Sequence, residues 1–170
     1  RDVGGVMVAL VPIAQDTSPE VSSTGNLVFL PTVDTAIAAA RDARAAGADL
    51  VVAVVQTNMA NDRLLMASHA FDLILSGDDH SYATAYDGIT AYVETSMDGR
   101  YLAPVDITVE IGNNNGNRTI DWTPSFRFID TALVTPDAET QAMVDRFTAQ
   151  LDESLNVVIG NTAGPLDSRR

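Results

Sequence analysis

Two side chains that could bind a metal ion follow an apolar run near the middle of the sequence. Asp78 and His80 come after Leu73-Ile74-Leu75-Ser76-Gly77 and stand two residues apart, so an extended loop could direct both toward one ion. A carboxylate oxygen and an imidazole nitrogen together suit Zn, Mn or Fe. The same spacing is also compatible with an ordinary polar loop that carries a surface histidine.

A second apolar run, residues 50–55, also ends in polar side chains, beginning with Gln56. Its amide oxygen is a neutral and therefore weak metal ligand, so Gln56 alone carries little weight, and simple strand termination is the alternative reading. The other histidine of the chain, His69, lies in Ala67-Ser68-His69-Ala70 and is predicted to be a solvated loop residue.

The elements around these residues alternate between short β-branched runs and amphipathic segments. Carboxyl ends of parallel strands meet at one edge of a sheet, where open α/β folds form their sites, so Gln56, Asp78 and His80 are expected to lie near each other. The sequence therefore predicts an α/β fold with a β-α-β-α-β series: strands at about 6–13, 50–55 and 72–75, and helices at about 33–46 and 62–67.

The later part of the chain has a different pattern. From Gly88 it reads as an antiparallel meander, with alternating residues 105–111 returning as 119–128 across an Asn- and Gly-rich turn. Thr135-Pro136 is a favourable helix start, and apolar spacing predicts a C-terminal helix to about residue 153. Val157-Val158-Ile159-Gly160 is then predicted to begin a new strand.

The composition excludes several classes of function. The net charge is −13, all ten basic residues are Arg, and the chain has no Cys. Polymeric nucleic acid is therefore an unexpected partner, because phosphate backbones need clustered positive charge. Disulfides, thiolate metal sites and cysteine nucleophiles are excluded, and no apolar run is long enough to span a membrane. Serine-hydrolase elbow, phosphate-loop and HExxH motifs are also absent.

Several stretches resemble the later half of the calcineurin-like metallophosphoesterase domain in the bacterial 5′-nucleotidase and 2′,3′-cyclic-nucleotide 2′-phosphodiesterase family. The stretch Gly77-Asp78-Asp79-His80 resembles its Gly-His-x-His motif, and Gln56 stands where the family has a His that ends the preceding strand. The other stretches are Gly4–Val11, Ala45–Val54, Phe71–Ser76, Tyr86–Gly88, Val93-Glu94, Gly99–Leu102, Leu151–Thr162 and Pro165–Arg170.

The resemblance implies half of a four-layer α/β/β/α sandwich over residues 1–130, with residues 131–170 forming a linker helix and the start of a C-terminal nucleotidase domain. It implies hydrolysis of nucleotide phosphate esters or other phosphomonoesters with two divalent metal ions, Mn, Zn or Fe. His80, Asp78 and Gln56 would be metal ligands. A periplasmic or secreted location is also implied by the resemblance alone.

Two departures from the family pattern shape this expectation. Asp78 and Gln56 replace two of the three histidines, and the family's Asp-x-His, Gly-Asp and Gly-Asn-His motifs, which belong to the earlier half of the domain, have no match. The start at Arg1 and the end at Arg170 also lack the character of natural termini. The chain is therefore expected to be a fragment, inactive without its missing N-terminal half. The alternative is a non-catalytic relative or binding module that has lost metal ligands.

Overall fold

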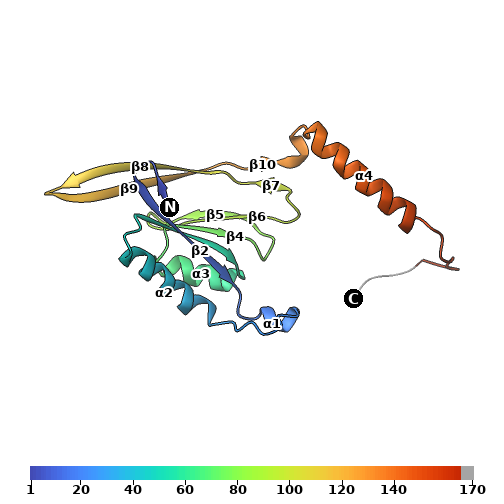
Figure 1. The fold of residues 1–170 in the computed structure, drawn as a ribbon, viewed down its shortest axis with the longest axis horizontal. Coiled ribbons are helices and arrows are strands. Elements are labelled where there is room, and N and C mark those ends of the chain that lie inside the picture. Colours follow the sequence, from blue (N-terminus) through green and yellow to red (C-terminus); the bar gives the residue numbers. More distant parts are fainter. Residues whose placement is uncertain (166–170) are drawn as a thin grey trace. The chain divides into compact units, whose positions relative to one another are not determined.

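The computed structural model of the chain describes residues 1–165 and divides into two compact units, one ending at Leu133 and the other beginning at Val134. The first unit is built around a six-stranded sheet with the order β1-β2-β3-β4-β6-β5 (Figure 1). Its strands are β1 (Asp2–Val3), β2 (Val6–Ala14), β3 (Leu50–Gln56), β4 (Leu73–Ser76), β5 (Tyr82–Tyr86) and β6 (Ala91–Thr95). Two further pairs join β7 (Tyr101–Leu102) to β10 (Ile129–Asp130), and β8 (Val105–Asn114) to β9 (Asn117–Phe126).

The strands β2, β3 and β4 are parallel, which confirms the predicted α/β arrangement. The predicted antiparallel meander from Gly88 is confirmed for the β8–β9 pair. It does not describe β6, which pairs with β5 in an antiparallel manner but with β4 in a parallel manner and so extends the central sheet.

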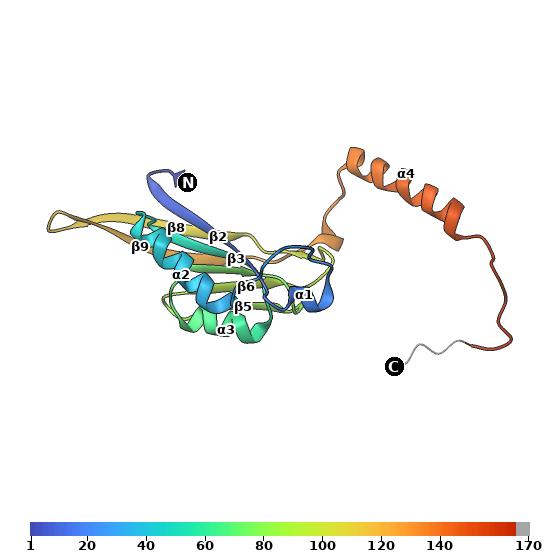
Figure 2. The same ribbon diagram turned by 60° about the horizontal axis from the view of Figure 1, so that its bottom comes forward.

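Helices α2 (Thr32–Ala45) and α3 (Met59–Ala67) cover one face of the sheet (Figure 2). Alternate residues of each strand point to this face, because side chains along a strand alternate between the two sides of the sheet. The small side chains of α2 allow the helix to approach the sheet closely. The buried core on this side includes Ala36 and Ala40 of α2, Val51, Ala53 and Val55 of β3, Leu65 of α3, Phe71 and Ile74.

The β8–β9 hairpin lies on the opposite face of the sheet (Figures 1 and 2). Its two-residue turn is formed by Asn115 and Gly116, whose φ angles of 54° and 87° fit the tight turn that matches strand twist. The first unit therefore has three layers, helices, sheet and hairpin, consistent with part of the predicted sandwich. The contact joins Val105, Ile107, Trp122 and Phe126 of the hairpin to Val52, Leu73 and Ala91 of the sheet.

Short segments complete the first unit. The four-residue helix α1 (Ser18–Val21) follows β2, and a single 3₁₀ turn (Thr131–Leu133) closes the unit. Helix α3 starts earlier than the predicted residue 62, because the Asn58 side chain caps it by accepting a hydrogen bond from the Asn61 amide at 3.0 Å.

The second unit contains helix α4 (Ala138–Leu155), which confirms the predicted C-terminal helix. It begins after Asp137, whose carboxylate accepts a hydrogen bond from the Thr140 amide at 2.9 Å, so the predicted start at Thr135-Pro136 is two residues early. Residues 157–160 form no strand within the described chain, and the predicted strand there is wrong. The predicted start of a further domain falls largely on residues 166–170, which lie outside the described residues.

Candidate functional site

The carboxyl ends of β2, β3 and β4 meet at one edge of the sheet. The register pairs Ala14 with Gln56, and Val55 with Ser76, so the residues that follow these strands emerge side by side. There the Gln56 side-chain amide donates a hydrogen bond of 2.7 Å from Nε2 to Asp78 Oδ1. Two of the three predicted ligand residues are thus brought into direct contact, from strands that are separated by a whole helix in the sequence.

A small pocket of about 230 Å³ opens beside this contact. The turn after β2 forms its other wall and is held in place by Gln15, whose Oε1 accepts a hydrogen bond from the Asn58 amide at 3.0 Å. No Arg lines the pocket among the described residues, so its polar groups are hydroxyls, amides and one carboxylate. Its lining residues are Gln15, Thr17, Ser18, Val21, Ser22, Gln56 and Asp78.

His80 has a different environment from the other two predicted ligands. It is exposed, and its φ of 57° lies in the left-handed region, so the loop is not extended there as predicted. Within the described residues, no hydrogen bond joins the His80 ring to Gln56 or Asp78. The neighbouring Asp79 fixes this turn from the other side, because its carboxylate accepts a hydrogen bond from the Met59 amide at the start of α3.

The donor set fits a metal ion only in part. Asp78 offers carboxylate oxygens, Gln56 offers an amide oxygen, and His80 offers an imidazole two residues further along the chain. Among residues 1–165, no group of three His, Asp or Glu side chains is close enough to hold an ion. Additional ligands from outside the described residues are therefore required for a complete metal shell.

A buried polar cluster, formed by Asp62, Tyr92 and Glu94, lies behind this loop. Glu94 is fully buried and Asp62 is 1% exposed. The Tyr92 hydroxyl lies 3.1 Å from Asp62 Oδ2 and 2.9 Å from Glu94 Oε2, and it therefore bridges the two carboxyl groups. Asp62 also accepts hydrogen bonds from the hydroxyls of Thr57 and, at 2.6 Å, of Ser76.

The hydrogen-bond count at Tyr92 requires an additional proton in this cluster. A phenol has one proton and can donate to only one of two carboxylates at a time, so both contacts are hydrogen bonds only if a carboxyl group is protonated. Burial raises the pKa of the Asp62 carboxyl above its ordinary value. This direction favours the protonated form of Asp62, which could donate to the Tyr92 oxygen.

Sequence reasoning missed Glu94 and Asp79 as residues that hold the candidate site. The signal for Glu94 was an acidic residue that directly follows the largely apolar run Ala91-Tyr92-Val93, where burial without partners is costly. Asp79 carried no such signal, because an acidic residue in a loop is ordinary.

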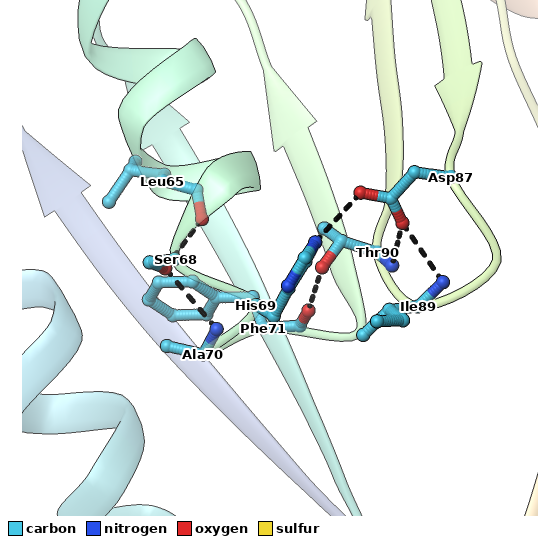
Figure 3. A network of polar contacts seen from close by, with 8 residues as sticks. All are labelled: Leu65, Ser68, His69, Ala70, Phe71, Asp87, Ile89 and Thr90. Carbon is cyan, nitrogen blue, oxygen red and sulfur yellow. Dashed lines mark hydrogen bonds and ion pairs between the residues drawn. The ribbon is translucent and has the colours of Figure 1, made fainter.

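His69 lies at the opposite edge of the sheet, before β4. Its Nε2 is 3.0 Å from Asp87 Oδ2, and Asp87 also accepts hydrogen bonds from the backbone amides of Ile89 and Thr90 (Figure 3). With its side chain 43% exposed, His69 is a solvent-facing loop residue, as predicted, and it has a hydrogen-bond partner that the sequence did not reveal. It takes no part in the candidate site.

Comparison with known proteins gives a structural likeness and no sequence match. No protein-family model and no curated protein sequence matches the chain. A crystal structure from Staphylococcus aureus, of a protein provisionally named a 5′-nucleotidase and solved in complex with alpha-ketoglutarate, is similar with a TM-score of 0.63 and 14% sequence identity. The likeness covers 89% of this chain and 33% of that chain, so this chain spans about a third of the neighbour's length. This chain therefore shares the fold of one part of that structure.

Proposed function

We propose that this chain is part of a metal-dependent phosphoesterase that hydrolyses nucleotide phosphate esters, of the 5′-nucleotidase or 2′,3′-cyclic-nucleotide phosphodiesterase type. The observation that carries the proposal is the contact between Gln56 and Asp78 at the carboxyl ends of two parallel strands, beside a polar pocket. Open α/β sheets bind ligands at this edge. The fold shared with a nucleotidase-like structure supports the class of reaction.

In this proposal, Asp78, His80 and Gln56 supply part of the ligands of two divalent ions, Mn, Zn or Fe. Asp78 provides negative charge and favours a harder ion than a histidine at this position would. Bound metal ions would supply the positive charge that stabilises a phosphoryl group during its transfer. This requirement is acute here, because no Arg lines the pocket within residues 1–165 and the chain carries a net charge of −13.

The missing N-terminal half of the domain is the partner that this proposal requires. The sheet face that carries the hairpin continues toward the candidate site as exposed apolar surface, with Leu10 64% and Val54 45% exposed. These residues share a face with Val52, which the hairpin covers. Further residues of the domain would pack on Leu10 and Val54 and bring the remaining metal ligands to the edge where Gln56 lies.

The finer parts of the proposal rest on the resemblance in sequence motifs. They comprise the nucleotide or other phosphomonoester substrate, the periplasmic or secreted location, and the division into a domain half over residues 1–130 and a linker region over residues 131–170. Among the helices of residues 1–165, none is long and apolar enough to cross a membrane.

The experiment is a hydrolysis assay on the longer gene product, with AMP, 2′,3′-cyclic AMP and p-nitrophenyl phosphate as substrates in the presence of Mn²⁺. Asp78→Ala and His80→Ala are each expected to lower kcat/KM by at least about tenfold, the effect of disturbing a metal site. His69→Ala is the matched control, because it removes the other histidine at the opposite edge of the sheet. Equal activity in all four proteins would contradict the proposal.

A non-catalytic relative is the second candidate, and one observation favours it. The Gln56 side chain directs its NH₂ group at Asp78 and donates a hydrogen bond to it, so Gln56 acts there as a donor and not as a metal ligand. Such a protein would bind a small polar ligand in the pocket and hydrolyse nothing. It is supported if the longer gene product binds AMP in equilibrium dialysis while showing neither bound metal nor hydrolysis.

A further inference from the structure

We propose that Glu94 is the positioning residue of the loop formed by residues 77–81, which carries Asp78 and His80. The inference rests on the proposed function in so far as this loop is a metal-binding loop. Its physical basis is a buried carboxylate that accepts hydrogen bonds from the backbone of the loop. No role for Glu94 follows from the motif that the loop itself resembles.

The contacts of Glu94 span both ends of the loop. Its Oε1 atom lies 3.4 Å from the Asp78 amide nitrogen and 3.1 Å from the Ser81 amide nitrogen. The strand register pairs Ser76 of β4 with Glu94 of β6, so the carboxylate stands directly beside the point where the loop leaves the sheet. One side chain therefore determines where the loop starts and where it returns.

Glu94 needs these donors as much as the loop needs the acceptor. The side chain is 0% exposed and has no Arg among its described hydrogen-bond and ion-pair partners. A buried carboxylate is costly unless hydrogen bonds replace its lost hydration. Its donors are the two loop amides and the Tyr92 hydroxyl, which lies 2.9 Å from Oε2. Folding of the loop and burial of Glu94 are thus coupled.

The loop conformation itself calls for such support. His80 has a φ of 57°, a left-handed conformation that a non-glycine residue adopts at a cost, and it persists only where surrounding contacts impose it. The amide of the next residue, Ser81, donates to Glu94, and the carbonyl of Ser81 accepts a hydrogen bond from the Ser96 amide at 2.7 Å. Hydrogen bonds to the amide and to the carbonyl of Ser81 therefore hold the turn at His80 in place.

Two conservative substitutions show whether Glu94 holds the loop through the length of its side chain or through its charge. Glu94→Asp keeps the charge but shortens the side chain, which withdraws the carboxylate from the Asp78 and Ser81 amides. Glu94→Gln removes the charge but keeps an acceptor oxygen at the same reach, and its NH₂ group can donate to the Tyr92 oxygen. If side-chain length is what positions the loop, the Gln variant retains the loop conformation and the Asp variant loses it.

The experiment measures hydrogen exchange of the Asp78 and Ser81 backbone amides by NMR in the full 170-residue chain, followed by titration with Mn²⁺ alone. Thr90→Ala is the matched control for destabilisation. Thr90 is also fully buried, but it lies just before β6, remote from the loop, and its hydroxyl donates to the Phe71 carbonyl. Wild type, Glu94→Gln and Thr90→Ala are expected to protect the two amides. Glu94→Asp is expected to raise their exchange rates at least about tenfold relative to Thr90→Ala, the ratio that corresponds to losing one hydrogen bond to a charged group.

The Mn²⁺ titration distinguishes this inference from the proposed function. The expected result is line broadening of residues 77–81 in wild type, with an apparent Kd at least about tenfold weaker in Glu94→Asp and unchanged in Glu94→Gln. If wild type shows no broadening, the residues of this chain alone do not hold Mn²⁺, and the metal content of the full-length gene product decides the metal site. The exchange rates still decide the role of Glu94. The positioning role is overturned if Glu94→Asp exchanges the two amides like Thr90→Ala, or if Glu94→Gln loses their protection.

Discussion

The buried carboxyl of Asp62 offers the sharpest test of how the polar cluster stabilises the fold. Asp62 is 1% exposed and accepts hydrogen bonds from Thr57 and Ser76 while it contacts the Tyr92 hydroxyl. The substitution Asp62→Ala leaves Thr57 and Ser76 without their acceptor, whereas Tyr92 retains Glu94. Thr57 is fully buried, so its unsatisfied hydroxyl costs about 1–3 kcal/mol, whereas Ser76 is half-buried and adds less. The free energy of unfolding should therefore fall by about 1–4 kcal/mol, a large share of the roughly 5–15 kcal/mol of a typical domain.

Asp62→Asn is the informative comparison because an amide resembles a protonated carboxyl. The amide oxygen can accept from Thr57, the NH₂ group can donate to the Tyr92 oxygen, and the Ser76 hydroxyl can rotate. We expect this variant to lose less than about 1.5 kcal/mol at neutral pH, the net value of one hydrogen bond.

The two proteins should also differ in how stability depends on pH. Because the pKa of Asp62 is raised in the folded state, the folded protein holds a proton at pH values where the unfolded chain has released it. Wild-type stability should therefore fall relative to Asp62→Asn as pH rises from about 4, near the ordinary pKa of 3.8, to the folded pKa. Above the folded pKa the difference should be constant.

The assay is urea unfolding at pH 4 to 8, followed through the fluorescence of Trp122, the one tryptophan of the chain, which packs against the central sheet. The reasoning is refuted if the wild-type and Asp62→Asn stabilities change in parallel over this range. It is also refuted if Asp62→Ala costs less than about 1 kcal/mol, because the cluster would then contribute no more than a surface hydrogen bond.

Two further predictions concern other contacts of the first unit. Gly116→Ala should lower the free energy of unfolding by about 1–2 kcal/mol in urea, because φ at Gly116 is 87° and side chains disfavour the left-handed region; an effect within about 0.3 kcal/mol would contradict this. The hydrogen bonds that Asp49 accepts from Arg118 and from the Met7 amide hold its pKa below the ordinary value of 3.8. Asp49 therefore stabilises the fold above pH 3.8, and this contribution to the free energy of unfolding is lost as pH falls through the folded pKa. In unfolding experiments between pH 2 and 5, Asp49→Asn should reduce the loss of stability that occurs as pH falls. An unchanged loss of stability would count against the contact.

Local sequence patterns predicted the elements that are defined by local rules. The β-branched runs at 6–13 and 50–55 form β2 and β3, and the Asn- and Gly-rich turn closes the β8–β9 hairpin. Their periodicity and turn chemistry act within a few residues, so one sequence is enough to reveal them. The same patterns failed at 157–160, where an apolar run has no neighbouring strand to pair with in the described chain.

Features that depend on distant residues could not be predicted in this way. The parallel pairing of β6 with β4 is set by the sheet as a whole and leaves no local signal. The contact between Gln56 and Asp78 followed from the rule that parallel strands end at one edge, whereas the left-handed turn at His80 depends on backbone contacts that the sequence does not display. For the same reason, no local pattern marks Glu94 as a partner of the loop.

Metal content of the full-length gene product, measured by inductively coupled plasma mass spectrometry after mild purification, tests the central claim most directly. The account predicts at least about one Mn, Zn or Fe per chain in wild type and in His69→Ala, and less in Asp78→Ala and in His80→Ala. Unchanged metal content in both of the latter variants would contradict the site assignment, and a metal-free wild type would contradict the proposed phosphoesterase.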